Sequence, residues 1–344
     1  MLHSIIMAGG IGARFWPLSR RQKPKQLLDL LGEGTLIEQT IVRVEPLIPA
    51  ERRWIVTNRE QMRMLQGAVP AIPERQFILE PLGRNTAPAI GLSAVRLLHE
   101  DPDAVMIVLP ADHRIQDVDA FRECLRMATD LVENSDLLAT IGIEPSRPET
   151  GYGYIQIDRA NPFSPRSAFK VKTFAEKPNL ETAKLFLESG EFLWNSGIFI
   201  WRADVIMQQI ADYLPQWYSG LQEIAAALGT PHEQEMSRQV FASLKGISID
   251  YGVMEHAPRV AVVKGTFGWS DVGSWDEVWR LLPHDGQQNA CRGNVRAVAT
   301  KRSLVLAQDK LIALVGVDNL VVVDAGDAIL ICPREGSQQV RAIV

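Results

Sequence analysis

A glycine-rich turn close to the N-terminus is the strongest chemical signal in the sequence. Gly9, Gly10 and Gly12 follow a short apolar run, and Arg14 and Lys25 come soon after them. Glycine lets backbone N–H groups approach an anion closely, and the two cations add positive charge around it. The spacing matches neither the P-loop of ATPases nor the G-x-G-x-x-G dinucleotide motif. The pattern therefore predicts a cradle for a triphosphate, with a plain strand-to-helix glycine turn as the alternative.

Asp112 and Asp271 are candidate ligands of a magnesium ion. Asp112 follows the apolar run Ala104–Leu109, so it lies at the carboxyl end of a candidate strand, where open α/β sheets bind ligands. Mg²⁺ takes one or two carboxylates together with substrate phosphates. Asp271 lies in a tryptophan-rich segment, where a buried carboxylate needs a partner such as a metal. The alternative for either residue is a capping or packing role.

The elements that position these residues alternate along the first two-thirds of the chain. Short apolar runs are typical of strands buried on both faces, and the amphipathic stretches between them are typical of helices. The expected strands are Ser4–Met7, Arg53–Thr57, Gln76–Leu79, Ala104–Leu109 and Leu138–Ile143, and the expected helices include Leu36–Val44, Asn85–Glu100 and Ala120–Asn134. This alternation predicts a Rossmann-like α/β fold with a mixed, mostly parallel sheet and helices on both faces.

The later part of the chain has a different texture. A strand is expected over 151–157, a loop around Trp194-Asn195, and a helix-rich stretch over about 204–245. From about residue 289, short β runs follow one another with turn signals between them, too closely spaced for crossover helices. We therefore predict two domains, residues 1–288 and an all-β tail of residues 289–344. The tail is too small to stand alone, so it should pack on the main domain or on a second subunit.

Composition excludes several classes of protein. The 344 residues carry 36 Lys and Arg against 41 Asp and Glu, a net charge of −5, so a general nucleic-acid binder is not expected. The 3 cysteines and 6 histidines lack metal-ligand spacing, which argues against a zinc site or a disulfide framework. Neither a membrane span nor a signal peptide is recognisable. We therefore expect a soluble, cytoplasmic protein with no membrane partner.

The glycine-rich turn, with Pro17-Leu18 and Pro24-Lys25 after it, resembles the signature loop of the sugar-phosphate nucleotidyltransferases. Five further segments resemble the mannose-1-phosphate guanylyltransferases of that family, in order over essentially the whole chain: Glu80–Ala89, Leu109–His113, Phe174–Pro178, Trp194–Gly197 and Phe267–Trp275. The resemblance implies a left-handed β-helix for the tail and a homodimer. Some bacterial members continue into an isomerase domain, and this chain is expected to end before one.

The resemblance also implies which residues bind each substrate. The signature loop and the segment after the third expected strand would bind the nucleotide through Ala8, Gly9, Gly10, Gly12, Glu80, Arg84, Asn85, Thr86 and Pro110. The sugar phosphate would be bound by Gly151, Tyr152, Gly153, Glu176, Lys177 and Asn195. Which group reads the guanine stays open between Glu80, Asn85 and the backbone. Asn85 or Thr86 is also suited to cap the following helix.

The implied reaction converts GTP and mannose 1-phosphate to GDP-mannose and pyrophosphate. The attacking phosphate oxygen is already ionised at pH 7, so neither a general base nor a covalent intermediate is required. Catalysis then rests on in-line positioning and charge stabilisation. Arg14 and Lys25 would hold the departing pyrophosphate and Lys177 the attacking phosphate, while Mg²⁺ on Asp112 and Asp271 would neutralise the oxygens at the α-phosphate.

Three alternatives are weighed against this hypothesis. The nearest is the same chemistry with another base or sugar, such as UTP, dTTP, glucose or heptose. An NAD-dependent dehydrogenase disagrees with the glycine spacing and makes no use of Arg14 and Lys25. A non-catalytic regulatory homologue should have lost phosphate or metal residues, which this sequence retains.

Overall fold

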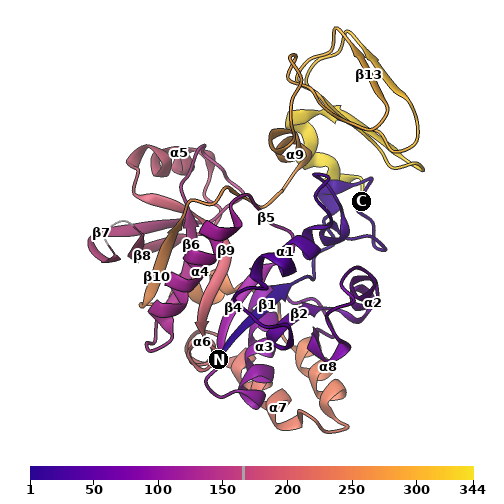
Figure 1. Ribbon diagram of the computed structural model, residues 1–344. Coiled ribbons are helices and arrows are strands. Elements are labelled where there is room, and N and C mark those ends of the chain that lie inside the picture. Colours follow the sequence, from indigo (N-terminus) through magenta and orange to yellow (C-terminus); the bar gives the residue numbers. More distant parts are fainter. Residues whose placement is uncertain (165–166) are drawn as a thin grey trace.

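A computed structural model describes residues 1–164 and 167–344. Its largest element is a nine-stranded sheet with the order β3-β2-β1-β4-β9-β6-β10-β8-β7 (Figure 1). The strands are β1 (Leu2–Met7), β2 (Arg53–Thr57), β3 (Phe77–Leu79), β4 (Val105–Pro110), β6 (Leu138–Ile143), β7 (Tyr154–Ser164), β8 (Ala168–Ala175), β9 (Phe192–Arg202) and β10 (Val260–Gly265). Neighbours from β3 to β4 are parallel, as are β6 and β10, whereas β9 runs antiparallel between β4 and β6. The predicted mixed, mostly parallel sheet is confirmed.

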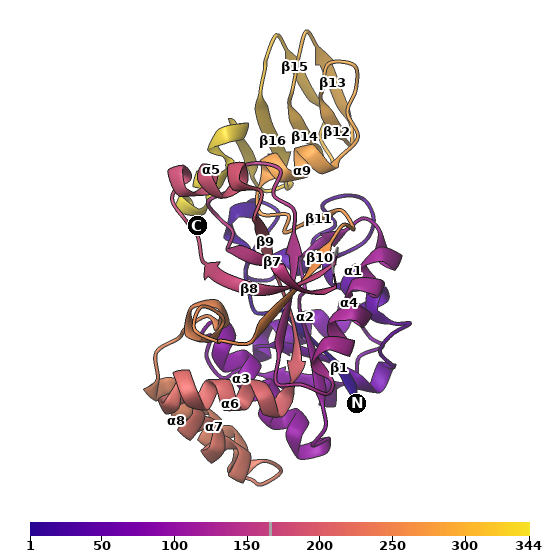
Figure 2. The same ribbon diagram turned by 90° about the vertical axis from the view of Figure 1, so that its left-hand side faces the viewer.

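Helices cover both faces of this sheet. The helices of the main domain are α1 (Leu36–Val44), α2 (Arg59–Ala68), α3 (Thr86–Glu100), α4 (Val118–Val132), α5 (Leu180–Ser189), α6 (Ala203–Tyr213), α7 (Pro215–Ala227) and α8 (Glu233–Ser243). A further helix, α9 (Trp275–Leu281), packs against the tail. Successive residues of β4 point to opposite faces: Met106 packs in the core with α3, α6 and α7, whereas Ile107 packs with α4. The helices α3 and α6 lie on one side of the sheet and α4 on the other (Figure 2). This double burial explains why the strands read as continuous apolar runs.

Two predictions for the middle of the chain differ from the structure. The expected loop at Trp194-Asn195 is wrong, because both residues lie inside the long strand β9. Gly197 has a φ of +69°, and the pairing of β9 with β6 shifts register between Thr140 and Gly142. These irregularities interrupt the apolar pattern of the strand, which is why the sequence resembled a loop. The strand expected over 151–157 begins three residues later, at Tyr154.

The tail forms a coil of short strands. The strands are β12 (Ala290–Arg292), β13 (Val295–Val298), β14 (Leu304–Leu306), β15 (Ile312–Val315), β16 (Leu320–Asp324) and β17 (Ile329–Pro333). β12, β14 and β16 pair in parallel in one sheet, and β13 and β15 pair in parallel in another. A chain that alternates between two parallel sheets winds like a β-helix. The final 3₁₀ helix, η6 (Arg334–Ala342), was not predicted from the sequence.

The tail packs on the main domain, which is one of the two arrangements predicted for it; the other is packing on a second subunit. Phe15 and Leu28, which flank the signature loop, share one buried cluster with Leu304 and Val321 of the tail. An ion pair of 3.1 Å between Arg20 and Asp327 crosses the same junction. Among the described residues, no helix combines the length and the apolar character that crossing a bilayer requires.

Candidate functional site

The glycine-rich turn follows β1 and lines a cavity of about 390 Å³. Most of the predicted nucleotide residues line this cavity, namely Ala8, Gly9, Gly10, Gly12, Glu80, Asn85 and Thr86. The candidate charged residues Lys25 and Asp112 line it too. The wall is completed by four residues that were not among the predicted site residues, namely Met7, Gln26, Gly83 and Ala111. The structure thus brings the loop, the segment after β3 and the end of β4 to one hollow.

Gly12 is a position where only glycine fits. Its φ of +72° is left-handed, and a Cβ built on it would collide with the Cβ of Lys25. The Ser19 hydroxyl donates a hydrogen bond of 2.7 Å to the Gly12 carbonyl and fixes the turn. The close approach of Gly12 to Lys25 holds the lysine stem against the floor of the cavity.

Lys25 joins the two candidate metal ligands. Its Nζ donates hydrogen bonds to Oδ2 of Asp112, at 2.7 Å, and to the backbone carbonyl of Asp271, at 2.6 Å. The Lys25 side chain is only 9% exposed. Burial pushes the pKa of Asp112 upwards, but the charges of Lys25 and His113 outweigh it and hold that pKa below its usual range. The ammonium of Lys25 therefore connects the carboxylate of Asp112 to the backbone of Asp271, which is far from it in sequence.

The donor atoms at this point suit a divalent cation. The Tyr152 hydroxyl donates a hydrogen bond of 2.6 Å to Oδ1 of Asp271, and the Lys25 ammonium donates to Oδ2 of Asp112. Within residues 1–164 and 167–344, the second oxygen of each carboxylate has no side-chain partner. The same residues contain no cluster of three or more His, Cys, Asp or Glu suited to hold a metal. Such a sparse set fits Mg²⁺, which takes its remaining ligands from phosphates and water.

Arg14, Arg84 and Pro110 do not line this cavity. The Arg14 guanidinium donates to the Gly273 carbonyl at 2.9 Å and to Oε1 of Gln338, in the tail, at 3.3 Å. The Arg84 side chain turns away to the carbonyl of Phe241, at 2.6 Å, and fastens the end of α8. For Arg84 the structure therefore shows a structural contact where the resemblance implies a nucleotide contact.

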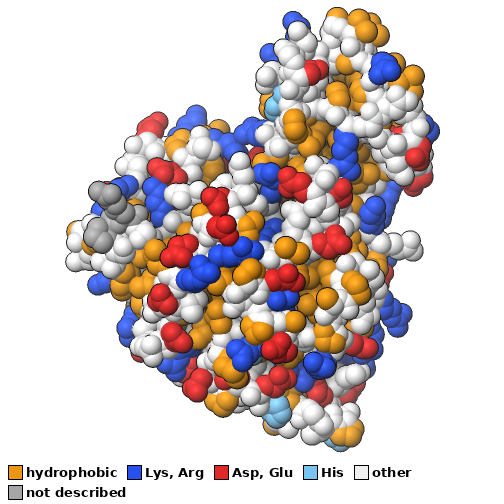
Figure 3. Space-filling view, viewed as in Figure 1, with side chains coloured by type: hydrophobic (Ala, Val, Ile, Leu, Met, Phe, Trp, Pro, Cys, Tyr) orange, Lys and Arg blue, Asp and Glu red, His pale blue; other side chains and the backbone are white. Residues whose placement is uncertain are grey.

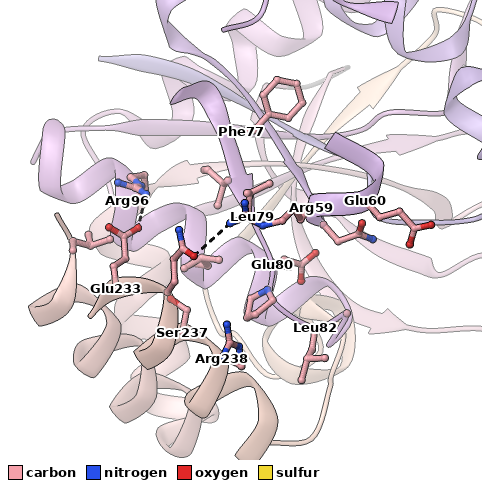
Figure 4. Close-up of a pocket in the computed structure, with 17 residues that line it drawn as sticks. Arg59, Glu60, Phe77, Leu79, Glu80, Leu82, Arg96, Glu233, Ser237 and Arg238 are labelled. Carbon is pink, nitrogen blue, oxygen red and sulfur yellow. Dashed lines mark hydrogen bonds and ion pairs between the residues drawn. The ribbon is translucent and has the colours of Figure 1, made fainter. Parts of the chain in front are cut away.

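Glu80 is the least satisfied polar group near the cavity. It is 9% exposed, and its Oε1 has no hydrogen-bond partner among the described residues. Burial raises the pKa of Glu80 to about 7. Glu80 also borders a second groove of about 680 Å³ between β3 and α8, where Arg96 and Glu233 form an ion pair of 2.7 Å (Figure 4). A buried carboxyl of this kind is a ready acceptor for the N–H donors of a ligand.

The predicted sugar residues form a cluster across β7, β8 and β9. The Asn195 N–H donates to the Gly153 carbonyl at 2.8 Å, and the Lys177 N–H donates to the Tyr152 carbonyl at 3.2 Å. The ammonium of Lys177 pairs with the carboxylate of Glu176. A Cβ on Gly153 would collide with that same carboxylate, so the glycine allows Glu176 to pack against the backbone here. Gly151 lies at the exposed edge, and its N–H donates to Glu149 at 3.1 Å.

Sequence analysis missed one member of this cluster. Oδ1 of Asp250 accepts a hydrogen bond of 2.9 Å from Nδ2 of Asn195. Burial, and then the charge of Glu176, raise the pKa of Asp250 to about 6. No residue spacing could have found Asp250, because it lies 55 residues from Asn195 and is brought to it only by the fold.

The chain is similar to known proteins over its whole length. Residues 3–288 match the nucleotidyl transferase family, and residues 293–344 match the mannose-phosphate isomerase/GMP-like β-helix domain. The mannose-1-phosphate guanylyltransferase of Escherichia coli strain K12 is 40% identical over 353 residues, covering 100% of this chain and 73% of that protein. The chain belongs to the mannose-1-phosphate guanylyltransferase family of nucleotidyl transferases.

Other members of the guanylyltransferase family are similarly close. The alginate biosynthesis protein AlgA of Pseudomonas syringae pv. tomato is 38% identical over 347 residues, covering 99% of this chain and 70% of that protein. A solved structure from Thermus thermophilus, described as a mannose-1-phosphate geranyltransferase, is 35% identical. It superposes with a TM-score of 0.90 over 99% of this chain and 98% of its own. The predicted family and the predicted β-helix character of the tail are therefore confirmed.

Proposed function

We propose that this chain transfers GMP from GTP to mannose 1-phosphate, giving GDP-mannose and pyrophosphate. The observation that carries the proposal is the bridge between the two candidate substrate sites. Lys25, on the wall of the nucleotide cavity, contacts Asp271, and Asp271 accepts the hydroxyl of Tyr152 from the sugar cluster. Family membership supplies the identity of the substrates, because relatives bear the name mannose-1-phosphate guanylyltransferase.

The reaction requires positioning more than acid or base catalysis. An oxygen of the sugar phosphate attacks the α-phosphorus of GTP, a new P–O bond forms, and the bond to the bridging oxygen of the β-phosphate breaks. The exposed ammonium of Lys177 would hold the attacking phosphate. Lys25, from the cavity wall, and Arg14, from its exposed position beside Gly273, would draw the departing pyrophosphate away.

We further propose that Asp112 and Asp271 hold Mg²⁺ together with phosphate oxygens. Bound there, the ion would neutralise negative charge at the α-phosphate. The support is that Lys25 contacts both residues, Asp112 through its carboxylate and Asp271 through its backbone carbonyl, and that each carboxylate has an oxygen free of side-chain partners among the described residues. Lys25 supplies positive charge at the same point and keeps Asp112 ionised.

Glu80 is the group we assign to the guanine base. Guanine carries a ring N–H and an exocyclic amino group side by side, and an acceptor carboxylate matches both donors, whereas uracil and thymine present one such donor. We expect pyrophosphate release to be fastest with GTP when GTP, ATP, UTP and dTTP are each tested against mannose 1-phosphate and glucose 1-phosphate. Glu80→Gln should reduce the preference for GTP about tenfold or more.

Glu60→Gln is the matched control for that variant, because Glu60 is an exposed carboxylate on the rim of the neighbouring groove. Equal turnover of the unsubstituted chain with UTP or dTTP would refute the assignment of the base and leave the fold untouched. Fastest turnover with glucose 1-phosphate would refute the assignment of the sugar.

Lys177 separates the two phosphate sites experimentally. Lys177→Ala should raise the KM for mannose 1-phosphate by about 10-fold or more and change the KM for GTP little, because the lost cation faces only one substrate. Lys172→Ala, which removes an exposed lysine from β8, is the control. Initial rates over a grid of both substrates give both constants. If the KM for GTP rises instead, the two phosphate sites have been assigned the wrong way round.

We also propose that the chain forms a homodimer through its tail. Val298, Val315 and Ile331 are 62%, 72% and 65% exposed, and hydrophobic side chains are visible on this part of the surface (Figure 3). Exposed apolar residues in such number are suited to contact another subunit.

We place the domain boundary at residues 288 and 289, before the first strand of the tail. A cytoplasmic location is supported by the free thiols of Cys124, Cys291 and Cys332.

A further inference from the structure

Asp250 lies at the start of an unusual helical turn. Residues Asp250–Met254 form a single π-helical turn, a rare conformation that occurs frequently at functional sites. The turn is anchored by Ile249, Val253 and Met254, whose side chains are completely or almost completely buried. Asp250 is thus a polar side chain held on a rigid support, and the reaction described above makes no use of it.

The contacts of Asp250 fix the orientation of Asn195. Nδ2 of Asn195 donates to Asp250 at 2.9 Å, while its Oδ1 accepts from the Thr140 hydroxyl and from the Gly197 N–H, both at 3.2 Å. Because all three partners are fixed, the amide of Asn195 has one orientation. Reversing it would place its oxygen against the carboxylate of Asp250.

The surroundings of Asp250 favour a ligand that brings hydroxyl donors. Glu176 lies close enough for its charge to raise the pKa of Asp250, and the ammonium of Lys177 is paired with Glu176. The carboxylate of Glu176 packs directly against the backbone of Gly153, where a Cβ would collide with it, so the absence of a side chain at Gly153 lets Glu176 take this position. Two neighbouring carboxylates and an oriented amide offer several acceptors, which a polyhydroxylated ring can satisfy with its O–H groups.

The segment that precedes Asp250 is fastened to the nucleotide cavity. The Ile249 N–H donates to the Thr86 hydroxyl at 2.8 Å, and the Ile247 N–H donates to the Arg84 carbonyl at 3.1 Å. Gly246 lies so close that a Cβ on it would be 2.6 Å from the same Arg84 carbonyl. The position of Asp250 is therefore set by backbone contacts with the segment that lines the nucleotide site.

We propose that Asp250 is a specificity-determining residue of the sugar site, which accepts a hydroxyl group of the sugar ring and orients the amide of Asn195. The proposal rests on the proposed function, because it takes the cluster of Gly153, Glu176 and Asn195 to be the sugar site. It extends that function by naming the residue that distinguishes a sugar from its epimers through the direction of one hydroxyl.

Two substitutions separate the direct contact from the orienting one. In Asp250→Asn, the amide oxygen can still accept from Asn195, so only the charge and the second acceptor are lost. Asp250→Ala removes both contacts. Asp212→Asn, which changes an exposed carboxylate on α6, is the matched control. Calorimetric binding of mannose 1-phosphate and of GTP to each full-length variant is the measurement, together with KM values and thermal unfolding.

We expect Asp250→Asn to weaken mannose 1-phosphate binding about 10- to 100-fold and to change GTP binding less than about twofold. Its preference for mannose 1-phosphate over glucose 1-phosphate should fall, and its Tm should not fall, because a charge repelled by Glu176 is removed. Asp250→Ala should bind the sugar phosphate more weakly still.

Unchanged sugar binding and unchanged epimer preference in Asp250→Asn would overturn the inference, as would an equal weakening of both substrates. A fall in Tm without any change in sugar binding would show a structural role alone and also overturn it. Failure of the unsubstituted chain to bind any sugar 1-phosphate would instead refute the proposed function, and the inference with it.

Discussion

Asp112→Asn and Asp271→Asn should each lower turnover by about two to four orders of magnitude. Loss of a group that stabilises charge in the transition state typically costs about 3–5 kcal/mol. Both substitutions change almost no volume, so the loss should appear in kcat with the fold retained. Pyrophosphate release at saturating GTP and mannose 1-phosphate measures the effect, and added Mg²⁺ should restore little of it.

The two variants should differ in stability. Asp112→Asn removes the charged partner of Lys25, whose ammonium lies at 2.7 Å, so its Tm should fall. Asp271→Asn keeps the backbone carbonyl that Lys25 contacts, and its Tm should change little. Asp119→Asn, a carboxylate with 92% exposure on α4, is the control for both. Near-normal turnover in Asp271→Asn would refute the shared metal site and leave Asp271 as a packing or capping residue.

Lys25→Met should abolish most activity and also destabilise the protein. Methionine keeps the apolar stem that packs against Gly12, but Asp112 and the carbonyl of Asp271 both lose their donor. Breaking a buried ion pair costs about 3 kcal/mol or more, and Asp112 is partly exposed, so we expect about 3 kcal/mol in the free energy of unfolding. Turnover should fall about 1,000-fold, because the same ammonium serves the leaving pyrophosphate.

Urea unfolding and steady-state rates test Lys25→Met, with the exposed Lys23→Met as the matched control. A variant that is destabilised but turns over normally would mean that Lys25 only supports Asp112. A variant with normal stability and lost activity would mean that the ion pair contributes nothing to the fold, and that Lys25 acts on the phosphates alone.

The sheet could be predicted because its strands are buried on both faces. Continuous apolar runs such as those of β1 and β4 are specific enough to place both strands within about two residues of their observed bounds. The glycine turn was equally visible, because Gly12 is required by its positive φ and by its approach to Lys25. Local requirements of this kind are written in the sequence itself.

Contacts made by distant segments could not be predicted in the same way. Arg14 precedes its partner Gln338 by 324 residues, and Arg84 precedes Phe241 by 157 residues, so no periodic pattern connects them. The π-helical turn of Asp250 has no sequence signature. The neighbours of Lys25 in the sequence predict that it binds phosphates. In the fold, its ammonium contacts the carboxylate of Asp112 and the backbone carbonyl of Asp271.

The buried cluster that joins the signature loop to the tail has a consequence for how this chain folds during its synthesis on the ribosome. Phe15 and Leu28 leave the ribosome early, but their partners Leu304 and Val321 are made only near the end of synthesis. The first part of the site to be synthesised is therefore among the last to be enclosed. Until translation is nearly complete, the nascent chain presents these apolar side chains to chaperones, and a ribosome that stalls before residue 304 yields a polypeptide without a finished catalytic loop.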